Sequence, residues 1–225
     1  MAEIRIDKLL RSKRRTIGIE ITQEAKLIVR APGHVSREYL ESIILKKRNW
    51  ILKKQKFFQQ RKSEYPARKF IEGESFYFLG NTFCLKIIAE GVIRLTECLE
   101  FPECLLVRAR ENLIQWYKAR AYEKIKERID WYSKITDLPY ASIKISNSRK
   151  RLGSCSFKGR LNFSWRLIMA PLAIIDYVVV HELTHLEELN HSSRFWNKVK
   201  AVLPDYKNQE ARLKNNQWFS SLDQE

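Results

Sequence analysis

Three of the four histidines in this sequence fall within eleven residues, at a spacing that suits one metal ion. His181, Glu182 and His185 form the pattern H-E-x-x-H, and His191 follows six residues later. On a helix, residues four apart lie on one face, about 5–6 Å apart, so His181 and His185 can offer two imidazole nitrogens to one cation. Glu182 lies one step round the helix, where it can act as a general base on water. The pattern therefore predicts metal-assisted hydrolysis.

The third ligand is less directly defined by the spacing. A catalytic zinc usually takes three protein ligands and keeps its fourth position open. On an unbroken helix His191 would lie about 120° round from His185 and would face away from the metal. His191 can bind only if the helix ends before it, and Asn190 suits a C-terminal cap. The alternative ligand is a carboxylate from a later helix, of which Glu210 is the best placed. We favour His191 and expect one Zn²⁺ per chain.

The motif needs a buried helix, which we expect to run from Ala173 to Leu189. Pro171 suits the start of this helix, and residues 178–180 (Val-Val-Val) give it an apolar frame. A long amphipathic helix is expected at 110–136, because apolar residues recur there every three or four positions. The remaining elements of this half are two strands and two helices, at 142–147, 160–165, about 193–203 and about 205–219.

The N-terminal half consists of short β-type segments around one basic helix. Residues 15–21 and 26–30 are predicted to form a hairpin. Ser36 is a suitable N-cap for a helix that we expect to continue to about Gln60. Four more strands are expected to join the hairpin in one antiparallel sheet, with the helix on one face. Their segments are 75–80, 83–89, 92–97 and 104–109.

These patterns together predict an α+β protein with two parts. Residues 1–109 are expected to form an N-terminal antiparallel β-rich region with one long basic helix. Residues 110–225 are expected to form helices and a small sheet, and their H-E-x-x-H motif resembles that of a zincin-like catalytic domain. A chain of 225 residues has room for such a division and for a sizeable core.

The charge balance favours anionic partners. The chain has 42 Lys and Arg against 26 Asp and Glu, a net charge of +16. The basic residues occur in runs, at 11–15, 46–56, 149–151 and 158–160. Such runs suit nucleic acid, nucleotides or acidic proteins, but they are equally compatible with a solvated basic surface. The basic helix is therefore interpreted either as a sheet-packed helix with solvated lysines or as a nucleic-acid footprint.

Composition predicts a cytoplasmic protein without a membrane span. The four cysteines are scattered without a C-x-x-C pair, so they indicate neither a disulfide framework nor a cysteine-rich zinc site. No apolar run reaches the roughly eighteen residues that a membrane span requires. The first fifteen residues carry charge throughout and lack the apolar region of a secretory signal.

The C-terminal half resembles the YgjP-like (DUF45) metallopeptidase family. The resemblance is carried by Gly-Ser-Cys-Ser at 153–156, by LNFSWRLI at 161–168 and by the segment 170–196 around the histidines. In the pattern H-E-x-x-H-x5-H-x3-F-W alone, the chain is also similar to WLM and SprT-like zinc peptidase domains. One position departs from the family, which commonly has Trp where this chain has Leu152.

The resemblance implies a hydrolase of the protease class. It implies zinc at His181, His185 and His191, with Glu182 as the catalytic residue. It leaves the substrate open, and a protein or peptide is the expected one. Two alternatives stay open beside it: a metal-dependent phosphohydrolase acting on nucleotides, and a nucleic-acid-associated peptidase.

Several other residues are candidates for supporting roles. Residues 160–165 could form an edge strand that pairs with an extended peptide, or equally an ordinary interior strand. Phe195 and Trp196 are expected to pack behind His191 as core residues. Four residues are candidates for substrate or oxyanion contact: Arg149, Arg151, Arg166 and Tyr206.

Overall fold

The structure is a computed structural model that describes residues 4–22, 24–64, 68–149, 151–215 and 218. The chain forms two compact units, Met1–Ala67 and Arg68–Asp223. The expected boundary at residue 109/110 differs from this division, which falls at 67/68. The difference arises because the strands between these points share one hydrophobic core with the C-terminal helices.

The first unit is a three-stranded sheet covered by two helices. The strands are β1 (Lys8–Ser12), β2 (Gly18–Ile21) and β3 (Leu27–Pro32), in the order β1-β3-β2. The predicted hairpin is confirmed, since β2 and β3 are antiparallel, whereas β1 runs parallel to β3. The hydrophobic core cluster of the unit comes from β3 and the two helices: Leu27, Val29, Ala31, Leu40, Ile44 and Ile51.

The long helix expected from Ser36 to Gln60 is two helices. They are α1 (Arg37–Lys46) and α2 (Arg48–Glu64), separated at Lys47. The predicted N-cap is confirmed, because the Ser36 hydroxyl accepts a hydrogen bond from the Tyr39 N–H. The break at Lys47 involves neither Gly nor Pro, so periodicity alone gave no signal for it.

The second unit begins with a four-stranded sheet of its own. Its strands are β4 (Ser75–Phe78), β5 (Asn81–Ile88), β6 (Arg94–Leu95) and β7 (Leu99–Pro102), in the order β4-β5-β7-β6. The expectation of one antiparallel sheet with the first hairpin is wrong, because this sheet is separate and β5 pairs with β7 in parallel. The segment 104–109, expected as a strand, lies in the 3-10 helix η1 (Glu103–Arg108) and the start of α3.

A tight turn between β4 and β5 docks this sheet against the chain ahead of the histidines. Leu79 and Gly80 both have positive φ, 48° and 83°, as a two-residue type I′ hairpin turn requires. Their N–H groups donate to the carbonyls of Ile168 and Met169, at 2.8 and 3.1 Å. A Cβ at Gly80 would lie 2.7 Å from Pro171 Cγ, so only glycine permits this contact.

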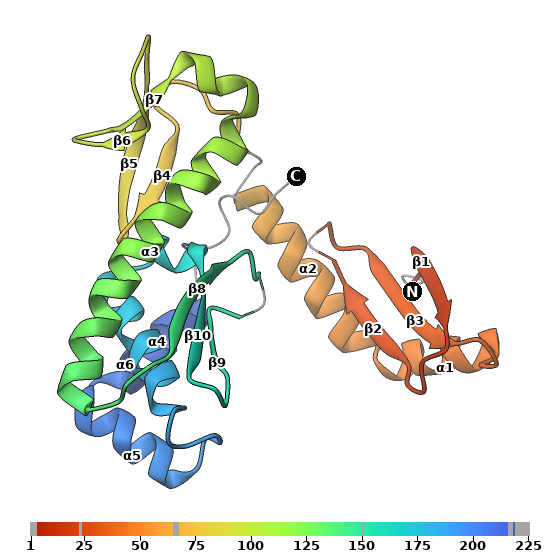
Figure 1. Ribbon diagram of the computed structural model, residues 1–225. Coiled ribbons are helices and arrows are strands. Elements are labelled where there is room, and N and C mark those ends of the chain that lie inside the picture. Colours follow the sequence, from red (N-terminus) through yellow and green to blue (C-terminus); the bar gives the residue numbers. More distant parts are fainter. Residues whose placement is uncertain (1–3, 23, 65–67, 150, 216–217, 219–225) are drawn as a thin grey trace. The chain divides into compact units, whose positions relative to one another are not determined.

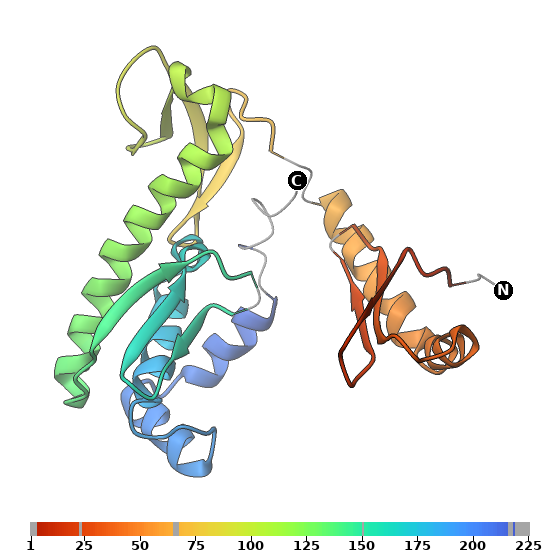
Figure 2. The same cartoon turned by 45° about the vertical axis from the view of Figure 1, so that its right-hand side comes forward.

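The predicted long helix is confirmed as α3 (Ala109–Thr136), which runs alongside both sheets of the second unit (Figures 1 and 2). Asp137, in the left-handed conformation, ends it. Its buried side chains recur every three or four residues and form one face: Ala109, Leu113, Tyr117, Ala121, Ile125, Ile129 and Tyr132. This face joins the two sheets of the unit through a single core.

The second sheet of this unit consists of β8 (Ser142–Ser146), β9 (Gly153–Cys155) and β10 (Arg160–Ser164), in the order β8-β10-β9. β10 is therefore the central strand, and of the two readings of residues 160–165 the interior strand is confirmed. β9 pairs antiparallel to β10 and lies at one edge. The 3-10 helix η2 (Trp165–Met169) follows, fully buried.

Three helices complete the unit: α4 (Leu172–Thr184), α5 (Ser193–Val202) and α6 (Tyr206–Asn215). The predicted α+β class is confirmed by this mixture of helices and small sheets. Within the described ranges, no helix is both long enough and apolar enough to cross a membrane.

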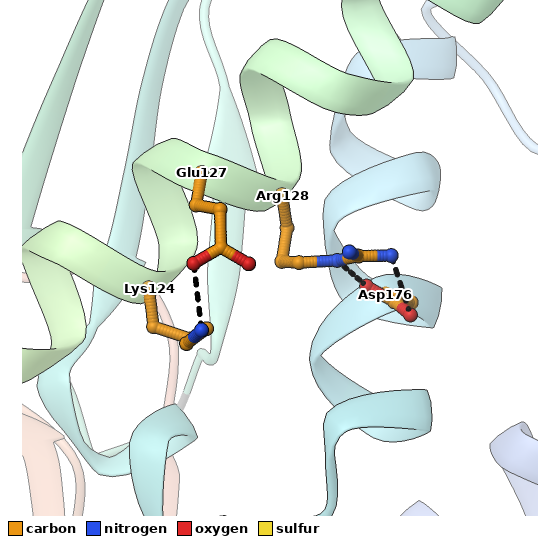
Figure 3. Close-up of polar contacts among 4 residues, drawn as sticks. All are labelled: Lys124, Glu127, Arg128 and Asp176. Atoms are coloured by element: carbon orange, nitrogen blue, oxygen red, sulfur yellow. Dashed lines mark hydrogen bonds and ion pairs between the residues drawn. The ribbon is translucent and has the colours of Figure 1, made fainter.

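One ion pair links the two central helices of this unit. Arg128 on α3 donates through Nε and Nη2 to the carboxylate of Asp176 on α4, at 2.5 and 3.1 Å (Figure 3). Both side chains are largely buried, with 18% and 13% of their surface exposed. Burial raises the pKa of Asp176, and the hydrogen bonds and charge of Arg128 oppose that effect. Arg128 therefore compensates a carboxylate that would otherwise be poorly solvated.

We expect Arg128→Met to lower the free energy of unfolding by about 2–3 kcal/mol, because it leaves the largely buried Asp176 without its charged partner. Urea unfolding of the variant, followed by circular dichroism, measures the loss. The double variant Arg128→Met/Asp176→Asn should recover part of it, because the unpaired charge is then removed as well.

The pair Lys124–Glu127 on the same helix provides a matched control (Figure 3). Lys124 Nζ and Glu127 Oε2 are 2.6 Å apart, but the two side chains are 30% and 54% exposed. Lys124→Met should therefore cost less than about 1 kcal/mol. If Lys124→Met and Arg128→Met lowered the free energy of unfolding equally, the Arg128–Asp176 pair would not stabilise the fold more than an exposed ion pair does.

Candidate metal centre

The helix that carries the motif ends earlier than the sequence suggested. α4 stops at Thr184, five residues before Leu189, and His185 is its C-cap. The Leu186 N–H donates to the Leu183 carbonyl at 2.9 Å, a tightened last turn of the i to i+3 type. The chain therefore leaves the helix axis directly after His185, in time for His191 to return towards the helix.

This turn brings the three histidines together. His181 Nε2 and His191 Nε2 lie 3.0 Å apart. One ring nitrogen from each of His181, His185 and His191 lies within 4.8 Å of the others. His185 Nδ1 is 2.9 Å from the Glu188 carbonyl oxygen, so it is the donor and Nε2 keeps the free lone pair. Three imidazoles at this spacing suit the donor set of a catalytic Zn²⁺.

Aromatic rings hold the histidines from behind. The buried Phe195 ring contacts all three imidazoles, with centroid distances of 4.6–4.9 Å. Trp196 stacks on His191 at 5.7 Å, and Tyr206 stacks on Trp196 at 5.3 Å. Phe195 is therefore a core residue, as predicted. Together with Ser192, whose hydroxyl caps α5, these rings fix the orientation of His191.

The environment keeps two of the imidazoles neutral. Burial, with the nearby His185 and His191, lowers the pKa of His181 to about 4. Burial also lowers the pKa of His185, although the Glu188 carbonyl opposes this. A neutral imidazole has a lone pair for a cation, so both groups are ready to act as ligands near neutral pH.

Glu182 lies beside the cluster, in contact with the edge strand β9. It is only 7% exposed. Its carboxylate packs so closely on Gly153 that a Cβ there would be 2.5 Å from Oε1. Burial raises the pKa of Glu182 to about 7, and the charge of Arg151 opposes the rise. A buried carboxylate with such a pKa suits a general base.

The other predicted site residues have different surroundings. Glu210 on α6 pairs with Lys214 at 2.9 Å and is not in the group of ligand atoms around the histidines. Arg166 is buried, and its guanidinium donates to the Asn147 and Ser148 carbonyls, which favours a structural role. Arg149 is exposed, in the connection between β8 and β9.

The sequence interpretation missed the role of Gly153. Its signals were its place in the Gly-Ser-Cys-Ser segment of the resemblance and the close approach of another group that a glycine in a strand often marks. The sequence interpretation also did not single out Tyr177 as a neighbour of the histidines. It lies one turn before His181 on α4, with the two rings 6.0 Å apart.

A family model describes most of this chain as a metallopeptidase domain. The YgjP-like family model, described as a metallopeptidase domain, matches residues 15–216. No curated protein matches significantly. Two solved structures are metallopeptidase zymogens. Abylysin of Pyrococcus abyssi is 23% identical, with a TM-score of 0.39 over 41% of this chain and 94% of that chain. Jannalysin of Methanocaldococcus jannaschii is 19% identical, with a TM-score of 0.37 over 40% and 94%.

We expect the purified protein to bind one Zn²⁺ per chain and His191→Ala to weaken binding by at least about tenfold, because one of three ligands is lost. Metal content by mass spectrometry and competition with a chelator measure this. Glu210→Ala is the matched variant and should keep the wild-type affinity. The opposite result, with Glu210→Ala losing the metal and His191→Ala keeping it, would identify the carboxylate as the third ligand.

Proposed function

This chain belongs to the YgjP-like metallopeptidase family, and we propose that it hydrolyses peptide bonds with one Zn²⁺ held by His181, His185 and His191. The observation that carries the proposal is the convergence of three imidazole nitrogens beside a buried glutamate. The family description favours a peptide over the phosphate ester of the alternative hypothesis.

Glu182 has the central role among the protein's own groups. When bound, Zn²⁺ supplies Lewis acidity, which polarises a carbonyl and makes water more acidic. Glu182 takes a proton from the attacking water and gives it to the departing amine nitrogen. Burial against Gly153 supports this exchange, because it holds the carboxylate in one place and raises its pKa towards neutrality.

The strand β9 offers a surface for an extended peptide. The carbonyl of Leu152, the residue before β9, accepts a hydrogen bond from the Ser164 N–H, and the Ser156 N–H donates one to the Arg160 backbone carbonyl. Because pairing alternates along an antiparallel strand, the N–H and C=O groups of Gly153 and Cys155 point away from β10. These groups lie at the sheet edge beside Glu182. We propose that substrate adds there as a further strand, with its backbone held next to the general base.

We expect both Glu182→Gln and Gly153→Ala to reduce cleavage of an unfolded protein such as casein by at least about 100-fold, with Zn²⁺ still bound. The first change removes the base, and the second displaces it, because the new methyl group would overlap the carboxylate. Cleavage assays and metal analysis of the same samples separate loss of chemistry from loss of metal.

Two control variants accompany these changes. Glu187→Gln alters an exposed carboxylate just beyond the end of α4, and Gly33→Ala adds a methyl group where no atom lies within 4 Å. Both should keep activity within about twofold, as surface changes usually do. Undiminished cleavage by Glu182→Gln would refute the assigned mechanism, whatever the identity of the substrate.

The first unit supports a second proposal, that this peptidase binds nucleic acid. Residues 1–67 contain 17 of the 42 basic residues and 7 of the 26 acidic ones, which gives +10 of the total +16. On α2, Trp50, Lys54 and Phe57 recur at helical spacing, and both aromatic side chains are 44% exposed. Exposed rings between lysines suit a single strand, whose bases stack while its phosphates pair with the cations.

We expect an oligonucleotide to bind with an affinity that falls steeply as salt rises. Lys53→Gln/Lys54→Gln should weaken binding and make the affinity depend less steeply on salt concentration. Fluorescence anisotropy of a labelled oligonucleotide measures both effects. Lys200→Gln/Lys207→Gln removes the same charge from exposed positions of the second unit and should bind like wild type. If both double variants weakened binding equally, or if the affinity did not change with salt concentration, α2 would not be the contact surface.

A further inference from the structure

Two cysteines lie side by side on the sheet β4-β5-β7-β6, outside the metal centre. β5 and β7 are parallel, with Leu85 opposite Leu99. Cys84 and Cys98 stand one position before these two residues. Because side chains alternate across a sheet and both leucines are buried, the cysteines point to the opposite, solvent-facing side. Cys84 is exposed and Cys98 partly exposed.

The geometry of the pair is close to that of a disulfide. The two sulfur atoms are 2.8 Å apart, at hydrogen-bonding distance. Neighbouring strands lie about 4.8 Å apart, which is within the roughly 4.4–6.8 Å range of Cα distances in disulfides. An S–S bond of about 2.05 Å therefore needs the sulfurs to approach by less than about 1 Å, without movement of the strands.

We propose that Cys84 and Cys98 form a reversible oxidation site, which a small-molecule disulfide such as oxidised glutathione converts to an internal disulfide. The more exposed Cys84, as thiolate, attacks the oxidant and forms a mixed disulfide, releasing one thiolate of the oxidant. Cys98, after losing its proton to solvent, attacks the Cys84 sulfur and releases the second. Two protein thiols and one small disulfide thus become one protein disulfide and two small thiols.

The bond would join β5 to the start of β7, the two central strands of this sheet, and would not involve the metal centre. It would close the segment 84–98, which contains β6 and the turn where the Thr96 N–H donates to the Cys98 carbonyl at 2.9 Å. This sheet packs beside the N-terminal end of α3, whereas α5 lies beside its other end (Figure 1). Metal content should therefore be the same in the reduced and oxidised forms.

The test uses the folded, fully reduced chain treated with oxidised glutathione. We expect the free thiols, counted in denaturant after an acid quench, to fall from four per chain to two. The intact mass should decrease by two hydrogens, and digestion without reductant should give a peptide pair that joins Cys84 to Cys98. Treatment with dithiothreitol should restore all four thiols.

Variants and unfolding provide the controls. Cys104→Ser removes an exposed cysteine that does not belong to the pair. The free thiols of this variant should fall from three per chain to one. Cys84→Ser should form no internal disulfide, because Cys98 then has no thiol beside it. A wild-type chain that keeps four thiols, or that gains glutathione without losing two hydrogens, would overturn the proposal. Equally fast linkage in urea would also overturn it, because the folded sheet would then have no part in the reaction.

Discussion

The early end of α4 is the constraint on which the candidate metal centre depends. His181 and His185 are one turn apart, so the helix brings them together by itself. His191 joins them only because the chain leaves the helix axis after His185 and returns. A helix continued to Leu189 would direct His191 about 120° away from His185. The rings of Phe195 and Trp196 then hold the returning imidazole in place.

A second close contact joins α4 to the sheet β8-β10-β9. Glu182 lies against the backbone of Gly153, so the position of the proposed general base depends on how the sheet packs on the helix. That packing is set by a larger core, in which α3 contacts both sheets of the unit. The β4–β5 turn adds a further contact, through Gly80 against Pro171 at the start of α4. Much of the second unit therefore determines the geometry of one carboxylate.

Sequence reasoning succeeded where the signal was local. The periodicity of α3, the Ser36 cap and the β2–β3 hairpin each depend on neighbours within a few residues, and the structure agrees with all three. It failed where a segment's structure depends on contacts with residues far away in the sequence. Residues 104–109 have a β-type composition, yet they form 3-10 and α-helical turns that lead into α3. The single sheet was wrong for the same reason, since strand pairing is decided between segments far apart in the chain.

The sequence by itself determined which groups the candidate metal centre contains: two imidazoles at helical spacing, a neighbouring carboxylate and a third histidine within reach. These follow from residue type and from helix geometry, which are local properties. Only the tertiary structure decided that His191 rather than Glu210 lies with the other histidines, that Gly153 makes room for Glu182, and that β9 is an edge strand. Each of these depends on contacts between separate elements, which form only when the common core packs.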